Sequence, residues 1–197
     1  MASTIAKKPL FLAVVSIGNP GARYKNTKHS VGHMFLEQMV KDFNFPLLNR
    51  HRSITGGQVS IKNDEPFMFF ESSTYMNTSG DACMKLMRWL KQTKAQEYDP
   101  KLLILHDELD LPVGKIKYRP ESFKVSGHNG LRDIKAKIAD PTARIAIGID
   151  RPDTKDSRVV ANYVLSPFTN QQKSLLFDTA YFQAVGIIQD IRENGHL

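Results

Sequence analysis

The sequence predicts one α/β domain with a twisted, mixed but mostly parallel sheet flanked by helices, and three observations favour that architecture. Residues 10–17 and 102–105 are continuous apolar runs, the pattern of strands that are buried on both faces of a sheet. Segments with helical periodicity separate the expected strands, as they do in parallel sheets. A chain of 197 residues has the ordinary length of one domain, so residues 1–197 are expected to form a single domain.

The first half of the chain begins with an expected flexible leader at 1–9, followed by the strand at 10–17. That strand stops at the Gly-Asn-Pro-Gly sequence of residues 18–21, because these residue types favour tight turns. Beyond it, apolar residues at the spacing of one helical face predict helices, and short apolar runs next to turn residues predict strands. On these grounds we expect a helix at 30–43, strands at 57–61 and 67–70, and a helix through 84–90.

The second half begins with the strand at 102–105, whose end delivers the polar residues 106–108. Residues 114–119 alternate with a period of two, which predicts a strand that carries its basic side chains on one face. The remaining elements are expected to be a helix at 129–138, a strand at 144–149 and a long C-terminal helix at 170–192.

Composition excludes several classes of protein. Apolar residues make up 41% of the chain and charged residues 24%, values that disfavour disordered and fibrous proteins. No stretch approaches 18 apolar residues, so no membrane-spanning helix is expected. The single cysteine, Cys83, excludes an internal disulfide and a cysteine-based zinc cluster, and its apolar neighbours predict that it is buried. No secretory signal is indicated, so we expect a cytoplasmic protein, with a mitochondrial one as the alternative.

The charge balance indicates the kind of partner to expect. The chain has 27 Lys and Arg residues against 20 Asp and Glu residues, a formal net charge of +7. Residues 115–144 contain eight basic and three acidic residues, so part of the excess lies in one segment. Such a segment suits the phosphates of a nucleic acid, although a solvated basic face is the favoured explanation when the segment is considered alone.

Polar residues that are hard to explain as ordinary surface follow the expected strands or begin helices. They are Asn19, His29, Asn77, Asp107, His128 and Asn129. Such positions converge on one cleft at the carboxyl edge of an α/β sheet, which makes these residues candidates for a site. Each also has a structural explanation when taken alone. Asn19 can be a turn residue, and Asn77 can cap a helix.

His29 and Asp107 suit the activation of water. A neutral imidazole can accept a proton from water near pH 7, and a carboxylate can hold its other nitrogen and stabilise the imidazolium. Asparagine amides can donate to a carbonyl oxygen on which negative charge develops. Signatures of serine hydrolases, P-loop hydrolases and dinucleotide enzymes are missing. A zinc site on His29 and His33, four residues apart, is an alternative, although no His-Glu-x-x-His sequence supports it.

Five motifs occur in order along the chain. They are Ile-Gly-Asn-Pro-Gly at 17–21, Thr-Lys-His-Ser-Val-Gly at 27–32, Thr-Tyr-Met-Asn-Thr-Ser-Gly at 74–80, His-Asp-Glu-Leu-Asp-Leu-Pro-Val-Gly at 106–114 and Gly-His-Asn-Gly-Leu-Arg-Asp-Ile at 127–134. In this order they resemble the bacterial-type peptidyl-tRNA hydrolase family over residues 10–168. The resemblance implies an esterase that cleaves the bond between a peptide and the terminal ribose of tRNA, without a metal or other cofactor.

The resemblance also implies roles for individual residues. His29 matches the catalytic histidine of the family, and Asp107 matches the aspartate that orients it. The implied substrate-binding residues are Asn19, Tyr24, Met76, Asn77, His128 and Asn129. The basic segment then becomes an expected surface for the acceptor arm of tRNA, formed by Lys115, Lys117, Arg119, Lys124, Arg132, Lys135 and Arg144. A monomer is expected.

Three features depart from the family pattern. Ser30 stands where many members have asparagine, which changes one hydrogen-bonding group in the cleft. The loop at 120–126 lacks the glycines of bacterial members and is more similar to eukaryotic ones. The chain ends at Leu197, short of the basic segment with which many members continue. A non-catalytic RNA-binding protein on the same scaffold, a fate that the family resemblance also allows, is kept as an alternative.

Overall fold

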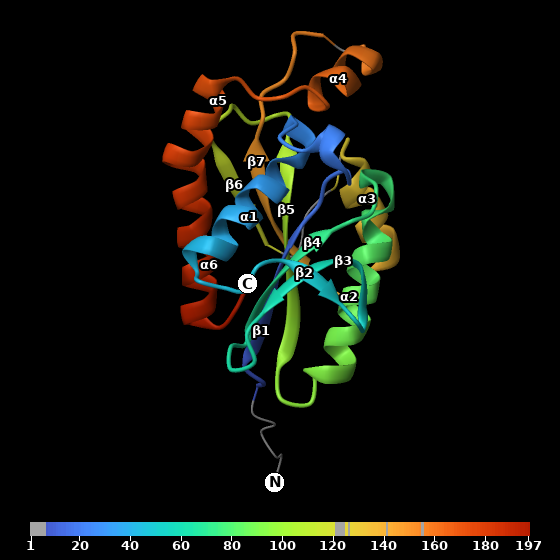
Figure 1. Ribbon diagram of the computed structural model, residues 1–197, viewed down its shortest axis with the longest axis vertical. Coiled ribbons are helices and arrows are strands. Elements are labelled where there is room, and N and C mark those ends of the chain that lie inside the picture. Colours follow the sequence, from blue (N-terminus) through green and yellow to red (C-terminus); the bar gives the residue numbers. More distant parts are fainter. Residues whose placement is uncertain (1–6, 121–124, 126, 141, 155) are drawn as a thin grey trace.

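The computed structural model describes residues 7–197 except 121–124, 126, 141 and 155. Its centre is a seven-stranded sheet in the order β2-β3-β4-β1-β5-β7-β6 (Figure 1). The four central strands β4, β1, β5 and β7 are parallel, whereas β2, β3 and β6 pair in antiparallel fashion at the two edges. The strands are β1 (Leu10–Ser16), β2 (Asn49–His51), β3 (Ile54–Ile61), β4 (Phe67–Ser72), β5 (Asp99–Glu108), β6 (Ile116–Arg119) and β7 (Thr142–Gly148).

Helices cover both faces of the sheet (Figure 1). The α-helices are α1 (Val31–Asp42), α2 (Ser79–Thr93), α3 (Asn129–Lys137), α4 (Ser157–Val164), α5 (Asn170–Leu175) and α6 (Tyr181–Asn194). Short 3-10 turns lie at Ala22–Tyr24, Lys28–Ser30 and Met76–Thr78, and a π-helical turn at Leu176–Ala180 joins α5 to α6. None of the helices in the described part of the chain is long and apolar enough to cross a membrane.

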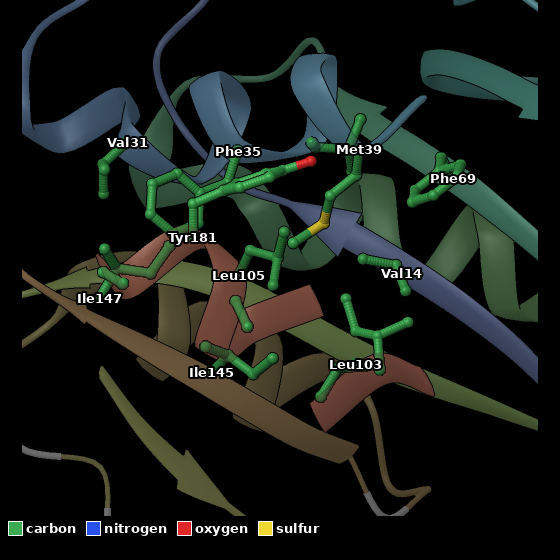
Figure 2. Packing of buried hydrophobic residues seen from close by; sticks show 14 of the residues in the cluster. Val14, Val31, Phe35, Met39, Phe69, Leu103, Leu105, Ile145, Ile147 and Tyr181 are labelled. Atoms are coloured by element: carbon green, nitrogen blue, oxygen red, sulfur yellow. The ribbon is translucent and has the colours of Figure 1, made fainter. Parts of the chain in front are cut away.

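Alternation along β1 divides the core into two layers. Leu12 and Val14 point to the face covered by α1 and α6, where Figure 2 shows Phe35, Met39 and Tyr181 packed against the strands. Phe11, Ala13 and Val15 point to the opposite face and pack against residues of α2 and α3. A strand buried on both faces has to be apolar throughout, and this explains why residues 10–17 show no polar alternation.

The predicted architecture is confirmed, and the differences have local causes. Strand β5 continues through Glu108, so His106 and Asp107 lie inside the strand and not beyond its end, paired with β7. Helix α2 begins at Ser79, earlier than the predicted segment. The long C-terminal helix is interrupted by the π-helical turn. Two elements were not predicted: β2, a largely exposed edge strand of three residues, and α4, which has no buried residue. Cys83 is buried, as expected.

Candidate active site

His29 and Asp107 form a direct pair at the carboxyl end of the sheet. The Nδ1 atom of His29 lies 2.8 and 2.9 Å from the two carboxylate oxygens of Asp107. Gly32 permits this approach, because a Cβ there would lie 2.5 Å from the backbone oxygen of Leu105 on β5. An ionised carboxylate only accepts hydrogen bonds, so Nδ1 of His29 carries the proton and Nε2 has the free lone pair. The ring is thus set to act as a base through Nε2.

The electrostatics of this pair favour a charged aspartate. Burial alone would raise the pKa of Asp107, which is 3% exposed, but the two neighbouring imidazoles and their hydrogen bonds hold that pKa far below its usual range. Burial lowers the pKa of His29, and the charge and hydrogen bond of Asp107 outweigh this effect, so the pKa is raised. Asp107 therefore stabilises the protonated ring that forms when His29 takes a proton.

His128 holds Asp107 from the other side. Its Nε2 atom lies 3.1 Å from Oδ1 of Asp107, and its Nδ1 atom accepts the backbone N–H of Leu131 at 3.2 Å as the N-cap of α3. The second contact fixes the proton on Nε2, so that His128 donates to the carboxylate. Both ring nitrogens are occupied within the protein. In this arrangement His128 orients the carboxylate of Asp107, and its predicted contact with substrate stays a prediction.

His106 completes this row of side chains and was not singled out from the sequence. Its ring is fully buried, its Nδ1 atom lies 2.7 Å from the backbone oxygen of Asp107, and it meets the His128 ring edge to face with centroids 5.1 Å apart. Burial lowers its pKa to about 3, aided by the nearby charges of His128 and Arg144, so the ring is neutral. The signal in the sequence was a polar residue within an otherwise apolar strand.

Asn19 connects the turn after β1 to the 3-10 turn at Met76–Thr78. Its side-chain oxygen accepts the backbone N–H of Met76 at 2.9 Å, which leaves the side-chain N–H₂ group as a donor. Met76 is buried against the start of α3, where a Cβ on Gly130 would lie 2.5 Å from its sulfur. Asn77 follows it and is exposed, with no capping hydrogen bond to α2. The capping explanation for Asn77 is therefore wrong.

The other two predicted substrate-binding residues, Asn129 and Tyr24, are more exposed than Asp107. Asn129 is exposed at the start of α3, and its side-chain oxygen accepts a hydrogen bond from Arg132. Tyr24 is half-buried in the first 3-10 turn, where the guanidinium of Arg23 lies 5.6 Å from the centre of its ring.

Lys28, which sequence reasoning missed, anchors the segment that carries His29. The residue is 4% exposed, and its ammonium group donates to the Ser166 hydroxyl and the Pro167 backbone oxygen, each at 2.9 Å. The same group lies 4.6 Å from the centre of the Tyr163 ring. Burial lowers its pKa. A cation enclosed by oxygen atoms and an aromatic face ties the turn that carries His29 to the chain after α4.

The predicted tRNA-binding residues divide into three groups. Lys115, Lys117, Arg132 and Lys135 are exposed, and Arg119 is half-buried. Lys124 lies outside the described residues, as does most of the loop at 120–126. Arg144 is 4% exposed because it lies on the central strand β7, where burial and the neighbouring charge of Arg119 lower its pKa to about 10. The prediction of a surface role for Arg144 is therefore wrong, since a buried guanidinium cannot reach a phosphate.

The structure does not support a zinc site on His29 and His33. The Nδ1 atom of His33 lies 2.7 Å from the Ser16 hydroxyl, and burial lowers the pKa of this ring to about 4. Among the described residues, the cluster of possible metal ligands consists of His29, Asp107 and His128, without His33. In that cluster the carboxylate already accepts hydrogen bonds from both imidazoles.

Comparison with known proteins decides the family. The sequence profile of the family described as "Peptidyl-tRNA hydrolase" matches residues 13–196. This chain belongs to the peptidyl-tRNA hydrolase family. It is 34% identical over 165 residues to a peptidyl-tRNA hydrolase of Sulfurihydrogenibium sp. (strain YO3AOP1), covering 83% of this chain and 82% of the relative. The corresponding enzyme of Lactococcus lactis subsp. cremoris (strain MG1363) is 32% identical over 183 residues, which cover 92% and 93%.

Solved structures agree with this assignment. A crystal structure of peptidyl-tRNA hydrolase from Acinetobacter baumannii superposes with a TM-score of 0.78 at 28% identity, covering 95% of this chain and 91% of that one. Membership of the peptidyl-tRNA hydrolase family confirms the resemblance that the five motifs indicated, and it makes the chain a carboxylic-ester hydrolase. The non-catalytic alternative receives no support from these relatives.

Proposed function

We propose that this peptidyl-tRNA hydrolase cleaves the ester between a peptide and the terminal ribose of tRNA by a water molecule activated at His29. The single observation that carries this proposal is the hydrogen bond of 2.8 Å between Nδ1 of His29 and the buried carboxylate of Asp107. It leaves Nε2 as the only basic atom of the ring. Family membership supplies the substrate class.

The reaction then follows from the roles of these groups. Nε2 of His29 removes a proton from water as the water oxygen attacks the ester carbonyl, and Asp107 stabilises the imidazolium. The side-chain N–H₂ group of Asn19 donates to the substrate, because the oxygen of that amide is held by Met76. The imidazolium returns its proton to the departing ribose oxygen, so that acid and alcohol are released and His29 is neutral again.

The remaining predicted residues surround this centre in the proposal. Asn77 and Asn129 bind polar atoms of the peptide and of the terminal nucleotide, while Met76 and Tyr24 form apolar walls. Exposed cations on β6 and α3 follow the phosphates of the acceptor arm, since phosphate contacts give affinity with little sequence preference. These cations are Lys115, Lys117, Arg119, Arg132 and Lys135.

Release of labelled peptide from an N-blocked aminoacyl-tRNA tests the proposal. Wild-type protein is expected to release the peptide with EDTA present, and His29→Ala is expected to retain tRNA binding and lose turnover. Wild-type protein that binds tRNA without releasing peptide would favour the RNA-binding alternative. Loss of turnover after EDTA treatment, restored by added metal, would contradict a mechanism that relies on His29 and Asp107 alone.

We further propose that the chain acts as a monomer in the cytoplasm, with the mitochondrion as the alternative location. The relatives reported above are bacterial proteins, which supports the cytoplasmic location. Sedimentation equilibrium of the purified protein and fractionation of cells that express the tagged chain test the two statements.

A further inference from the structure

Asn19 also lines a cleft. It is bounded by α1, by the turn after β1 and by the ends of β3 and β4, and its volume is about 260 Å³. That is smaller than the roughly 300–1,000 Å³ of pockets for drug-sized ligands, and is suited to one long side chain. Asn19 and Ser30, the residue that follows His29, line it, together with Lys25, His33, Glu37 and Glu71.

Glu71 is the unusual residue of this cleft. It lies near the end of β4, opposite Ser16 of β1 in the sheet register. Its Oε2 atom is buried and accepts no hydrogen bond from the described residues. Leaving a buried carboxylate oxygen without a partner is costly, and such groups in native proteins call for an explanation in terms of function or a bound group.

The charges that face Glu71 leave its own charge unbalanced. From α1, Glu37 adds a second negative charge, and His33 is neutral because burial lowers its pKa to about 4. Among the described residues that line the cleft, the one cation is Lys25, which lies after the first 3-10 turn and pairs with Glu37 at 3.6 Å. Gln58 on β3 and Ser16 on β1 carry no charge. Burial, and then Glu37, raise the pKa of Glu71 to about 7, opposed by Lys25.

We propose that this cleft receives the side chain of the amino acid esterified to tRNA, and that Glu71 selects lysine or arginine at that position. The proposal rests on the proposed function, because it places the ester at His29. A cationic side chain entering past Asn19 and Ser30 would meet a carboxylate whose neighbouring cation, Lys25, is already paired with Glu37. A neutral side chain gains no such contact, and an acidic one meets two carboxylates.

The test compares side chains of the same shape on one tRNA. A single tRNA is acylated with N-acetyl-lysine or with N-acetyl-norleucine, which lacks only the ammonium group, and kcat/KM is measured for both. Wild-type protein is expected to prefer lysine about tenfold at pH 8, the size of one partly buried ion pair. The preference should decrease toward pH 6, since Glu71 becomes protonated. In Glu71→Gln the lysine-to-norleucine ratio should be close to one.

A matched control removes a carboxylate elsewhere. Glu97 is exposed after α2, at the opposite end of the strands, and Glu97→Gln should keep the wild-type ratio. Equal lysine-to-norleucine ratios in wild type and Glu71→Gln would overturn the inference while leaving the hydrolase intact. Failure of wild type to release either amino acid would instead overturn the proposed function. Each variant is first checked by its circular dichroism spectrum and unfolding curve, and Glu71→Asp, which keeps the charge, should retain part of the preference.

Discussion

Replacement of Asp107 by asparagine removes the charge that faces His29 and keeps the shape of the side chain. At an effective dielectric constant of about 20, opposite charges separated by 2.8 Å attract each other by about 6 kcal/mol. The cost of burying Asp107 offsets part of this attraction. We therefore expect kcat to fall by about 10²–10⁴-fold, or about 3–5 kcal/mol, the usual contribution of an oriented general base. KM should change by less than about threefold, because the charge acts mainly when His29 is protonated.

The assay is initial-rate hydrolysis of an N-blocked aminoacyl-tRNA across pH 5–9. A base must be neutral, so kcat/KM of the wild type should decline as the pH falls through the raised pKa of His29. In Asp107→Asn that decline should begin at a lower pH, because the carboxylate no longer favours the imidazolium and burial then dominates. The pH at which activity declines therefore reports on the interaction between His29 and Asp107.

Asp110 supplies the control, since it follows the end of the strand that carries Asp107, is 69% exposed and pairs with Arg151. Asp110→Asn should stay within about twofold of wild type, as expected for an exposed ion pair. The reasoning is refuted if Asp107→Asn loses less than about tenfold in kcat, or if its decline at low pH coincides with that of the wild type.

Three further predictions concern stability and binding. Lys28→Met should lower the free energy of unfolding in urea by roughly 1–3 kcal/mol and reduce kcat, because two hydrogen bonds are lost. Lys28→Arg keeps the charge and should recover much of the stability and of the kcat. Equal losses in the two variants would contradict an anchoring role for the charge. The pKa values of His33 and His106, about 4 and about 3, lie below that of an unfolded histidine, so the unfolded chain binds protons first as pH falls. The free energy of unfolding should therefore decrease as the pH falls from about 6.5 to about 4, by up to about 1.4 kcal/mol per pH unit for each ring. A urea midpoint that stays constant over that range would disprove the burial of the two histidines as neutral groups. Lys117→Ala with Lys135→Ala should raise KM and reduce the slope of log KM against log salt by about two, whereas Lys91→Ala on α2 should leave both unchanged; an unaltered slope in the double variant would exclude these phosphate contacts.

Much of the fold could be predicted because the central strands have no polar face. Residues 10–17 and 102–105 had to be buried on both sides, and turn residues marked where the first of these strands stops. Strand β2 and helix α4 could not be predicted in the same way, because neither buries an apolar stripe. Helix α4 is instead started by Asp156, whose side chain accepts the backbone N–H of Arg158.

The candidate site was only partly visible in the sequence. His29 and Asp107 were expected to meet because both stand near the carboxyl ends of strands. The burial of Arg144 could not be predicted, because a basic residue at the start of the expected strand at 144–149 does not indicate that this strand is buried on both faces. Lys28 and Glu71 were missed for a related reason. The first hydrogen-bond acceptor of the Lys28 ammonium group lies 138 residues away in the sequence, and the cleft at Glu71 is formed by four separate segments.

The two contacts of His128 also restrict what evolution or a protein engineer can place at position 128. The residue there must accept the backbone N–H of Leu131 close to its own backbone and donate to Asp107 from the far end of its side chain. Asparagine and serine can do the first but are too short for the second, while lysine and arginine can donate but cannot cap a helix. Histidine combines both in one rigid ring. Selection for activity from a library of all twenty amino acids at this position should therefore return histidine alone.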